Sequence, residues 1–271
     1  MLKIITAFAT LVAGGAHAQT CGDADTPCEI SGGFYHASIP DGDVTGAVVF
    51  LHGYGGRASA TVRNTGLMNA MNSQGYAVIA VQGMPVRQGS QGGSWNSRAR
   101  GDGRRDDVAF IDAVADDAEQ RFDFPRKNTV LAGFSGGGMM TWRVACDAPD
   151  AFAAYAPIAG TFWNPIPEDC AAPIRIFHTH GTSDTVVPLA GRTVGSGAQQ
   201  GDVFEVLQNQ RTLHGCPIDI PAQTETLGQF EIQHWTSCSN GGEINLALHT
   251  GGHSIPRGWT QMMLDWYEAP N

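Results

Sequence analysis

Short apolar runs that alternate with helical patterns are the feature that most restricts how this chain can fold. Several of the runs, such as Ala47–Leu51, contain no polar residue, which is typical of strands covered on both faces. Three segments between or after the runs, Arg105–Phe122, Asp202–Leu213 and Trp259–Tyr267, are predicted helices. Strands that alternate with helices predict an α/β protein with a mostly parallel sheet and helices on both faces. The predicted strands are Tyr35–Ile39, Ala47–Leu51, Tyr76–Val81, Thr129–Ala132, Phe152–Ile158, Ile174–Thr179, Phe230–Thr236 and Ile244–Leu248.

The composition fits a single globular domain and disfavours two classes of partner. Of the 271 residues, 42% are hydrophobic and 15% are charged, so the chain can bury a large core. A net charge of −10 repels nucleic-acid phosphates and anionic lipid surfaces, and we expect neither nucleic acid nor a membrane as a partner. No internal repeat or shift in composition marks a second domain. We therefore predict one α/β domain over residues 19–271.

The first residues contain the three parts of a secretory signal peptide. Lys3 precedes an apolar run over residues 4–12, and Ala16-His17-Ala18 provides a cleavage site with small residues. The apolar run is too short to span a bilayer. We therefore expect residues 1–18 to be a signal peptide and the mature protein to be secreted, into either the periplasm or the extracellular space.

Export to an oxidising compartment predicts disulfides for the six cysteines. No C-x-x-C pair is present, which disfavours a zinc site, and we expect no metal and no other cofactor. Six cysteines can pair in many ways, and the sequence alone does not choose among them. Proximity along the chain suggests the pairs Cys21–Cys28, Cys146–Cys170 and Cys216–Cys238.

A G-x-S-x-G pattern lies where a predicted strand passes into a helix. Gly133-Phe134-Ser135-Gly136-Gly137 directly follows Thr129–Ala132, and the next residues can continue as a helix. This context is typical of a nucleophile elbow, in which small residues on either side of the serine let strand and helix pack closely. The helix N-terminus also directs free N–H groups toward a developing oxyanion. The alternative interpretation is a glycine-rich turn with an exposed serine.

Two later strand ends supply the other members of a catalytic triad. A serine needs an imidazole base, and the base needs a carboxylate that orients it. Asp184 follows the strand Ile174–Thr179, and His253 follows the strand Ile244–Leu248. The chain order Ser135, Asp184, His253 is the order of the α/β-hydrolases.

Other histidines are weaker candidates. His178 and His180 alternate on one predicted strand and could suggest a metal site, but such pairs are more often hydrogen-bonded packing residues. His52 precedes the serine, which is the wrong order for the base, and His234 lies within a predicted strand. His253 follows glycines in a predicted loop, where a ring has the freedom that a base needs.

The loop after Ala47–Leu51 is the expected source of a second oxyanion donor. It reads His52-Gly53-Tyr54-Gly55-Gly56, and its glycines allow the backbone to approach a ligand closely. We assign the oxyanion hole to the N–H groups of Tyr54 and Gly136. The alternative is an ordinary tight turn.

Six motifs, spread in order over nearly all of the predicted mature chain, carry a family resemblance. They are Leu51-His52-Gly53, Trp95-Asn96, Asp106-Asp107-Val108, Gly133-Phe134-Ser135-Gly136-Gly137, His180–Pro188 and Gly252-His253. With them the chain resembles the secreted polyhydroxybutyrate depolymerase/feruloyl esterase-like branch of the α/β-hydrolases, which is similar to carbohydrate esterase family one. The resemblance implies the same triad and oxyanion hole, and a late disulfide between Cys216 and Cys238.

The expected activity is that of a serine carboxylesterase that forms an acyl-enzyme. The resemblance implies an ester substrate, either polysaccharide-linked or polymeric, and we favour feruloyl or acetyl esters. A polyhydroxybutyrate or other polyester depolymerase is one alternative, and a serine peptidase on the same fold is another. A non-catalytic carbohydrate- or partner-binding module is the alternative from a different class, against which an intact triad argues.

Aromatic residues near two strand ends are candidate substrate contacts. Trp95 lies in the long loop after Tyr76–Val81, and Phe162 and Trp163 follow Phe152–Ile158. Flat apolar side chains at the mouth of the site would suit a feruloyl ring or a sugar face. The alternative is that these aromatic residues pack inside the core.

Overall fold

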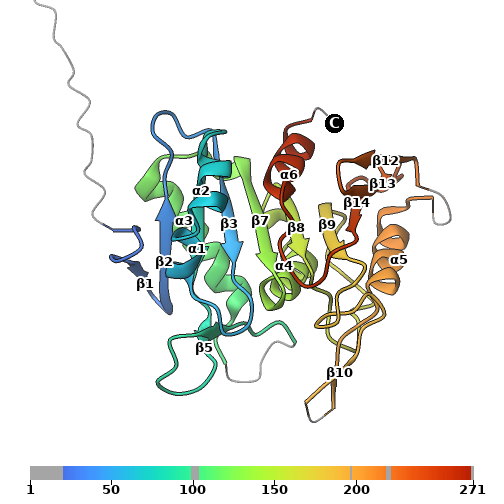
Figure 1. The fold of residues 1–271 in the computed structure, drawn as a ribbon, viewed down its shortest axis with the longest axis horizontal. Coiled ribbons are helices and arrows are strands. Elements are labelled where there is room, and N and C mark those ends of the chain that lie inside the picture. The colour runs from blue at the N-terminus through green and yellow to red at the C-terminus, as the bar shows by residue number, and fades with distance from the viewer. Residues whose placement is uncertain (1–20, 99–103, 196, 218–220, 270–271) are drawn as a thin grey trace, which may run out of the picture.

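A ten-stranded sheet forms the centre of the structure, which is a computed structural model that describes residues 21–98, 104–195, 197–217 and 221–269. The predicted signal peptide lies outside the described residues. The strand order is β1-β2-β4-β3-β7-β8-β9-β14-β13-β12, and the six strands from β4 to β14 in this order are parallel (Figure 1). Antiparallel strands complete both edges. The prediction of a mostly parallel sheet is confirmed.

The strands of the sheet include all eight that the sequence predicts, and two more. Their bounds are β1 Cys28–Ile30, β2 Gly33–Ser38, β3 Gly46–Leu51, β4 Tyr76–Val81, β7 Thr129–Phe134, β8 Ala154–Ile158, β9 Arg175–Gly181, β12 Gln223–Leu227, β13 Phe230–Trp235 and β14 Glu243–His249. Two short hairpins pair β5 Met84–Pro85 with β6 Gly93–Ser94, and β10 Thr193–Val194 with β11 Ala198–Gln199. The edge strands β1 and β12 are the ones that the sequence does not predict.

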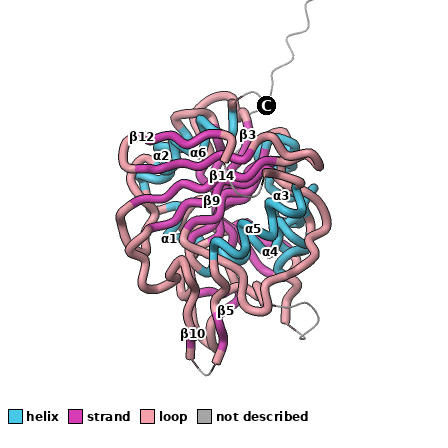
Figure 2. The backbone as a smooth tube through the Cα atoms, turned by 90° about the vertical axis from the view of Figure 1, so that its right-hand side faces the viewer, coloured by secondary structure: helices cyan, strands magenta, loops and turns pink. Residues whose placement is uncertain are grey.

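Helices cover both faces of the sheet. Figure 2 shows α3, α4 and α5 on one side and α2 and α6 on the other. Alternate residues of β3 divide between these faces: Val49 and Leu51 pack on the first side, and Val48 and Phe50 on the second. Strands buried in this way read as continuous apolar runs. The bounds are α1 Ala58–Val62, α2 Thr65–Asn72, α3 Asp107–Phe122, α4 Gly136–Asp147, α5 Val203–His214 and α6 Trp259–Glu268, with short 3₁₀ turns at Arg126–Asn128 and Pro149–Ala151.

The helix predicted from Arg105 begins two residues later, because Asp106 is its N-cap. The Asp106 carboxylate accepts hydrogen bonds from the N–H groups of Val108 and Ala109. At the other end Asp123 adopts a left-handed conformation and terminates the helix. Asp107 is thereby the first helical residue, and its side chain points into the protein, where it is 2% exposed.

Three disulfides join the cysteines in the pairs that proximity suggested. They are Cys21–Cys28, Cys146–Cys170 and Cys216–Cys238. The second fastens the end of α4 to the segment before β9, and the third fastens the end of α5 to the segment after β13. Within the described residues, no helix is long and apolar enough to cross a membrane.

The parallel strands present their carboxyl ends along one edge of the sheet. The loops that contain β5 and β10 extend from this same edge (Figure 1). In open α/β sheets, ligands bind at this edge. The segments that follow β3, β7, β9 and β14 include Tyr54, Ser135, Asp184 and His253, so the fold gathers the candidate site there.

Candidate active site

Ser135 forms a one-residue turn between β7 and α4. Its backbone has φ 58° and ψ −117°, a region that residues other than glycine rarely adopt. Two backbone hydrogen bonds support the turn: the Ser135 N–H donates to the carbonyl of Ile158 at 2.8 Å, and the Ser135 carbonyl accepts from Met139 at 2.9 Å. The arrangement matches the nucleophile elbow that the sequence predicts.

The glycines of the G-x-S-x-G motif are required by close backbone contacts. A Cβ atom on Gly133 would overlap the carbonyl oxygen of Gly137, and a Cβ atom on Gly137 would overlap the carbonyl oxygen of Leu51. Any side chain at these positions would push α4 away from β3 and β7. The motif thus sets the distance between the helix and the sheet on either side of Ser135.

The structure brings Ser135, His253 and Asp184 together in one hydrogen-bonded line. His253 Nε2 lies 2.8 Å from Ser135 Oγ, and His253 Nδ1 lies 2.7 Å from Asp184 Oδ2. A carboxylate only accepts hydrogen bonds, so Nδ1 carries the proton and Nε2 is left to accept from the serine hydroxyl. His253 is 118 residues from Ser135 and 69 residues from Asp184 in the sequence, so it is the fold that brings the three side chains together.

The Asp184 carboxylate is buried and is held on its other side by the backbone. Its side chain has no exposed surface, and Oδ1 accepts hydrogen bonds from the N–H groups of Val186 and Val187 at 2.8 and 2.9 Å. These bonds compensate for the loss of water around the charge. They also leave Oδ2 directed toward His253.

The N–H groups of Tyr54 and Gly136 lie next to each other beside Ser135. A Cβ atom placed on Gly136 would be 3.2 Å from Tyr54 N, and one placed on Gly53 would be 3.4 Å from the Cβ of Ser135. Within the part of the chain that the structure describes, neither N–H donates a hydrogen bond. Two adjacent N–H donors without acceptors, next to a serine hydroxyl, form the arrangement expected of an oxyanion hole.

A buried polar cluster holds the loop that carries Tyr54. The Trp95 indole N–H donates to the His52 carbonyl at 2.8 Å, and the Asp107 carboxylate accepts from Asn96 N at 2.6 Å. Arg105 lies 2.6 Å from the same carboxylate. Trp95 is only 8% exposed, so most of its surface is in the core. Trp95-Asn96 and Asp107 belong to two motifs of the sequence, but only the fold shows that Asp107 holds Asn96 while Trp95 holds the loop.

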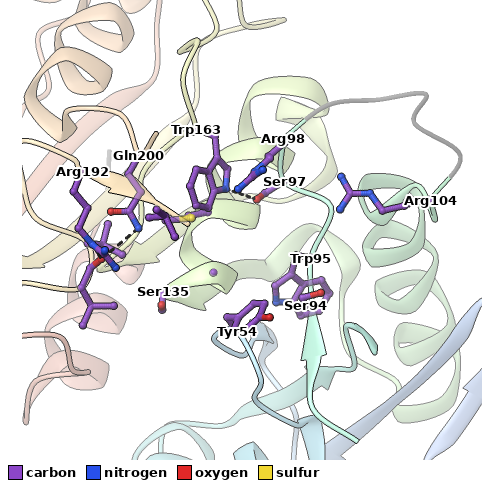
Figure 3. A pocket seen from close by; sticks show the side chains of 15 residues that line it. Tyr54, Ser94, Trp95, Ser97, Arg98, Arg104, Ser135, Trp163, Arg192 and Gln200 are labelled. Atoms are coloured by element: carbon purple, nitrogen blue, oxygen red, sulfur yellow. Dashed lines mark hydrogen bonds between the residues drawn. The ribbon is translucent and has the colours of Figure 1, made fainter. Parts of the chain in front are cut away.

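A cavity of about 520 Å³ opens in front of Ser135 (Figure 3). Tyr54, Gly136, Trp95 and Trp163 line it, together with Met139, Val186 and Val194. The indole N–H of Trp163 donates to Ser97 Oγ at 3.2 Å, and the Arg98 guanidinium lies 4.1 Å from the centre of its ring. Arg98, Arg104 and Arg192 also border the cavity, which gives it guanidinium donors suited to substrate oxygens.

One predicted contact is not brought to the cavity. Phe162 is 2% exposed and packs against Trp142 in the core, with ring centres 5.7 Å apart. The expectation that Phe162 lines the mouth of the site is therefore corrected. Its neighbour Trp163, by contrast, lines the cavity.

Burial lowers the pKa of five histidines in the described residues. They are His52, His178, His180, His214 and His249, and for each the largest cause is burial, which disfavours the charged ring. The effect is strongest for His178, which also faces His180. No group of His, Cys, Asp and Glu side chains in the described residues is arranged to hold a metal ion.

Comparison with known proteins assigns the chain to a family. Residues 37–200 match the model of the Phospholipase/Carboxylesterase family. The chain belongs to this family. It is therefore an ester hydrolase, in an esterase branch of the α/β-hydrolase superfamily.

The individual proteins that this chain resembles have low sequence identity to it. Feruloyl esterase C of Emericella nidulans is 26% identical over 88% of this chain and 84% of its own length. The bifunctional acetylxylan esterase/xylanase XynS20E of Neocallimastix patriciarum is 27% identical over 75% of this chain, and the match spans 28% of that protein. The structure of an acetyl xylan esterase from Aspergillus awamori is 16% identical, covers 86% of this chain and 93% of its own, and has a TM-score of 0.61. This last likeness shows the fold alone.

We predict that the protein loses stability as the pH falls below about 6.5. The buried histidines stay neutral in the folded chain, whereas in the unfolded chain they take up protons near their usual pKa of 6.5. The unfolded state then binds more protons, so the free energy of unfolding is highest above that pH and falls below it, by about 1.4 kcal/mol per pH unit for each proton. Urea unfolding between pH 7.5 and 5.5 measures this slope.

A single-site variant tests whether the buried histidines cause this pH dependence of stability. His214→Asn removes one of the five histidines, and its slope should be smaller than that of the wild type. A wild-type free energy of unfolding that is constant or rises toward pH 5.5 would contradict the account.

Proposed function

We propose that this chain is a serine carboxylesterase that acts through Ser135, His253 and Asp184. The observation that supports this most directly is the continuous line of hydrogen bonds at 2.8 and 2.7 Å through the three side chains. His253 is positioned to accept the proton of the Ser135 hydroxyl, and Asp184 to orient His253 and to stabilise its protonated form. The acid is buried and held by backbone N–H groups, so it can serve this role without moving.

The proposed reaction has two halves. Ser135 Oγ attacks the ester carbonyl carbon while its proton passes to His253 Nε2, and the N–H groups of Tyr54 and Gly136 stabilise the oxyanion. The bond to the alcohol oxygen then breaks, and the alcohol leaves with the proton from His253. In the second half, water gives a proton to His253 and attacks the acyl carbon. The bond to Ser135 Oγ then breaks, His253 returns the proton to Ser135 Oγ, and the carboxylic acid leaves.

We propose feruloyl and acetyl esters as the substrate class. Two proteins to which this chain is similar carry the names feruloyl esterase C and acetylxylan esterase/xylanase. The cavity also offers an aromatic wall at Trp163 and apolar side chains at Met139 and Val194, next to the serine. An aromatic acyl group can pack on such a wall, and the smaller acetyl group can enter the same cavity.

We also propose that the protein is secreted. Three disulfides support this, because such bonds form and persist in oxidising compartments.

Replacing the proposed nucleophile should abolish ester hydrolysis. We expect Ser135→Ala to lower kcat for p-nitrophenyl acetate by about 10⁴- to 10⁶-fold, since only the attacking oxygen is lost. The exposed Ser254, which follows His253 directly, provides the matched control, and Ser254→Ala should keep wild-type activity. Wild-type turnover by a folded Ser135→Ala variant would rule out the proposed mechanism.

Removing the Trp163 side chain should change KM more for an aromatic ester than for an acetyl ester. We expect Trp163→Ala to raise KM for methyl ferulate by roughly 3- to 10-fold, the loss of one aromatic contact, and to change KM for an acetyl ester much less. Trp266→Ala, on α6 outside the cavity, is the control and should leave both values unchanged.

The same assay discriminates between substrate classes. An equal effect of Trp163→Ala on both esters would argue against the aromatic wall as a substrate contact. A wild type that prefers hydroxybutyrate oligomers to methyl ferulate would favour a polyester depolymerase.

A further inference from the structure

A buried chain of hydrogen bonds leads from helix α4 to the loop that carries Asp184. Trp142 Nε1 lies 3.3 Å from His178 Nδ1, His178 Nε2 lies 3.0 Å from His180 Nδ1, and His180 Nε2 lies 2.7 Å from the carbonyl oxygen of Val187. Trp142 is 1% exposed, and both histidines are 0% exposed. The proposed reaction uses none of these side chains, although the line of hydrogen bonds ends beside the proposed acid.

The groups at the two ends of this line of hydrogen bonds, the Trp142 indole and the Val187 carbonyl, fix the direction of every bond in it. An indole N–H only donates, so His178 Nδ1 accepts and the neutral ring carries its proton on Nε2. This proton is donated to His180 Nδ1, which places the His180 proton on Nε2. There it meets the Val187 carbonyl, which only accepts. Burial keeps both rings neutral, because it lowers the pKa of each.

The Val187 peptide group connects His180 to Asp184. Its carbonyl accepts from His180, and the Val187 N–H donates to Asp184 Oδ1 at 2.9 Å. His180 Nε2 also lies 3.6 Å from Asp184 Oδ2, too far for a hydrogen bond, with its N–H dipole near the carboxylate. The ionisable groups that face His180 are His178, Asp184, His249 and His253, so Asp184 is its only acidic neighbour among the described residues.

We propose that His180 is a positioning residue for the proposed triad. By holding the Val187 carbonyl, it keeps the backbone that binds Asp184 in place and so directs Oδ2 toward His253. His178 and Trp142 ensure that the His180 proton is on the nitrogen that faces this carbonyl. Trp142 belongs to α4, whose first turn adjoins Ser135. The line of hydrogen bonds therefore connects the helix that follows the nucleophile to the loop that carries the acid. This inference rests on the proposed function.

Two polar substitutions test where the donor must lie. The side-chain amide of glutamine can place an N–H near the position of Nε2, whereas the shorter asparagine reaches only the position of Nδ1. We expect His180→Gln to keep most of the wild-type kcat. His180→Asn should lower kcat by about 10- to 100-fold with a smaller change in KM, because Asp184 and His253 lose alignment while Trp163 and Met139 of the cavity lie on other segments.

His214 provides the matched control for loss of a buried histidine. It is also 0% exposed and hydrogen-bonded on both ring nitrogens, to Gln210 and Ile174, away from the proposed triad. We expect His214→Asn to lower the melting temperature, as His180→Asn does, but to keep the wild-type kcat at a temperature where the protein is folded. The kcat values and melting temperatures of all three variants are measured together.

The outcomes separate this inference from the proposed function. Equal kcat values for His180→Gln and His180→Asn, or a loss of kcat in His214→Asn as large as in His180→Asn, would show that His180 acts only through stability. If either of these results is found while Ser135→Ala is inactive in the same assay, the proposed role of His180 is wrong and the proposed function still stands. If Ser135→Ala is active, the proposed function fails first.

Discussion

The left-handed backbone of Ser135 is the constraint on which the site depends. A residue other than glycine in such a region costs on the order of 1–3 kcal/mol and persists only when its surroundings require it. Here the requirement comes from packing: β3, β7 and α4 meet so closely that Gly133 and Gly137 admit no Cβ atom. The contact that strains the serine also places Tyr54 N beside Gly136. The same turn therefore presents the hydroxyl and forms the pair of N–H donors for the proposed oxyanion hole.

The remaining groups reach this turn because the parallel strands end at one edge of the sheet. Loops at such an edge are free to carry polar residues, but they must be held rigidly if they are to align side chains. Two buried polar clusters do this on either side of Ser135. Asp107, with Arg105, fixes the segment that supports the Tyr54 loop, and the His178–His180 pair fixes the segment that carries Asp184. The Asp107 carboxylate and both histidines are buried, where an unpaired polar group is costly, so each cluster has a defined geometry.

The sequence predicted the parts of this structure that depend on local pattern. Continuous apolar runs gave the inner strands, and the order of Ser135, Asp184 and His253 after three of those strands predicted residues that the fold brings within hydrogen-bonding distance. The edge strand β12 was missed because all of its residues are exposed and mostly polar, so no apolar run marks it. The sequence predicts Trp95, Phe162 and Trp163 at the site, but only Trp95 and Trp163 line the cavity, since an aromatic residue after a strand can turn inward as easily as outward. Alternation put His178 and His180 on one face of a strand, yet their partner Trp142 comes from a distant helix that sequence spacing cannot identify.

In the proposed mechanism, Ser135 carries the acyl group during turnover. The most direct measurement is acid quenching of the enzyme during hydrolysis of a p-nitrophenyl ester, followed by proteolysis and mass spectrometry of the peptides. We expect a mass increase equal to the acyl group on the peptide that contains Ser135, located to that residue by fragmentation, and no such increase in Ser135→Ala. An acyl group on a different residue that forms and decays at the rate of turnover would contradict it.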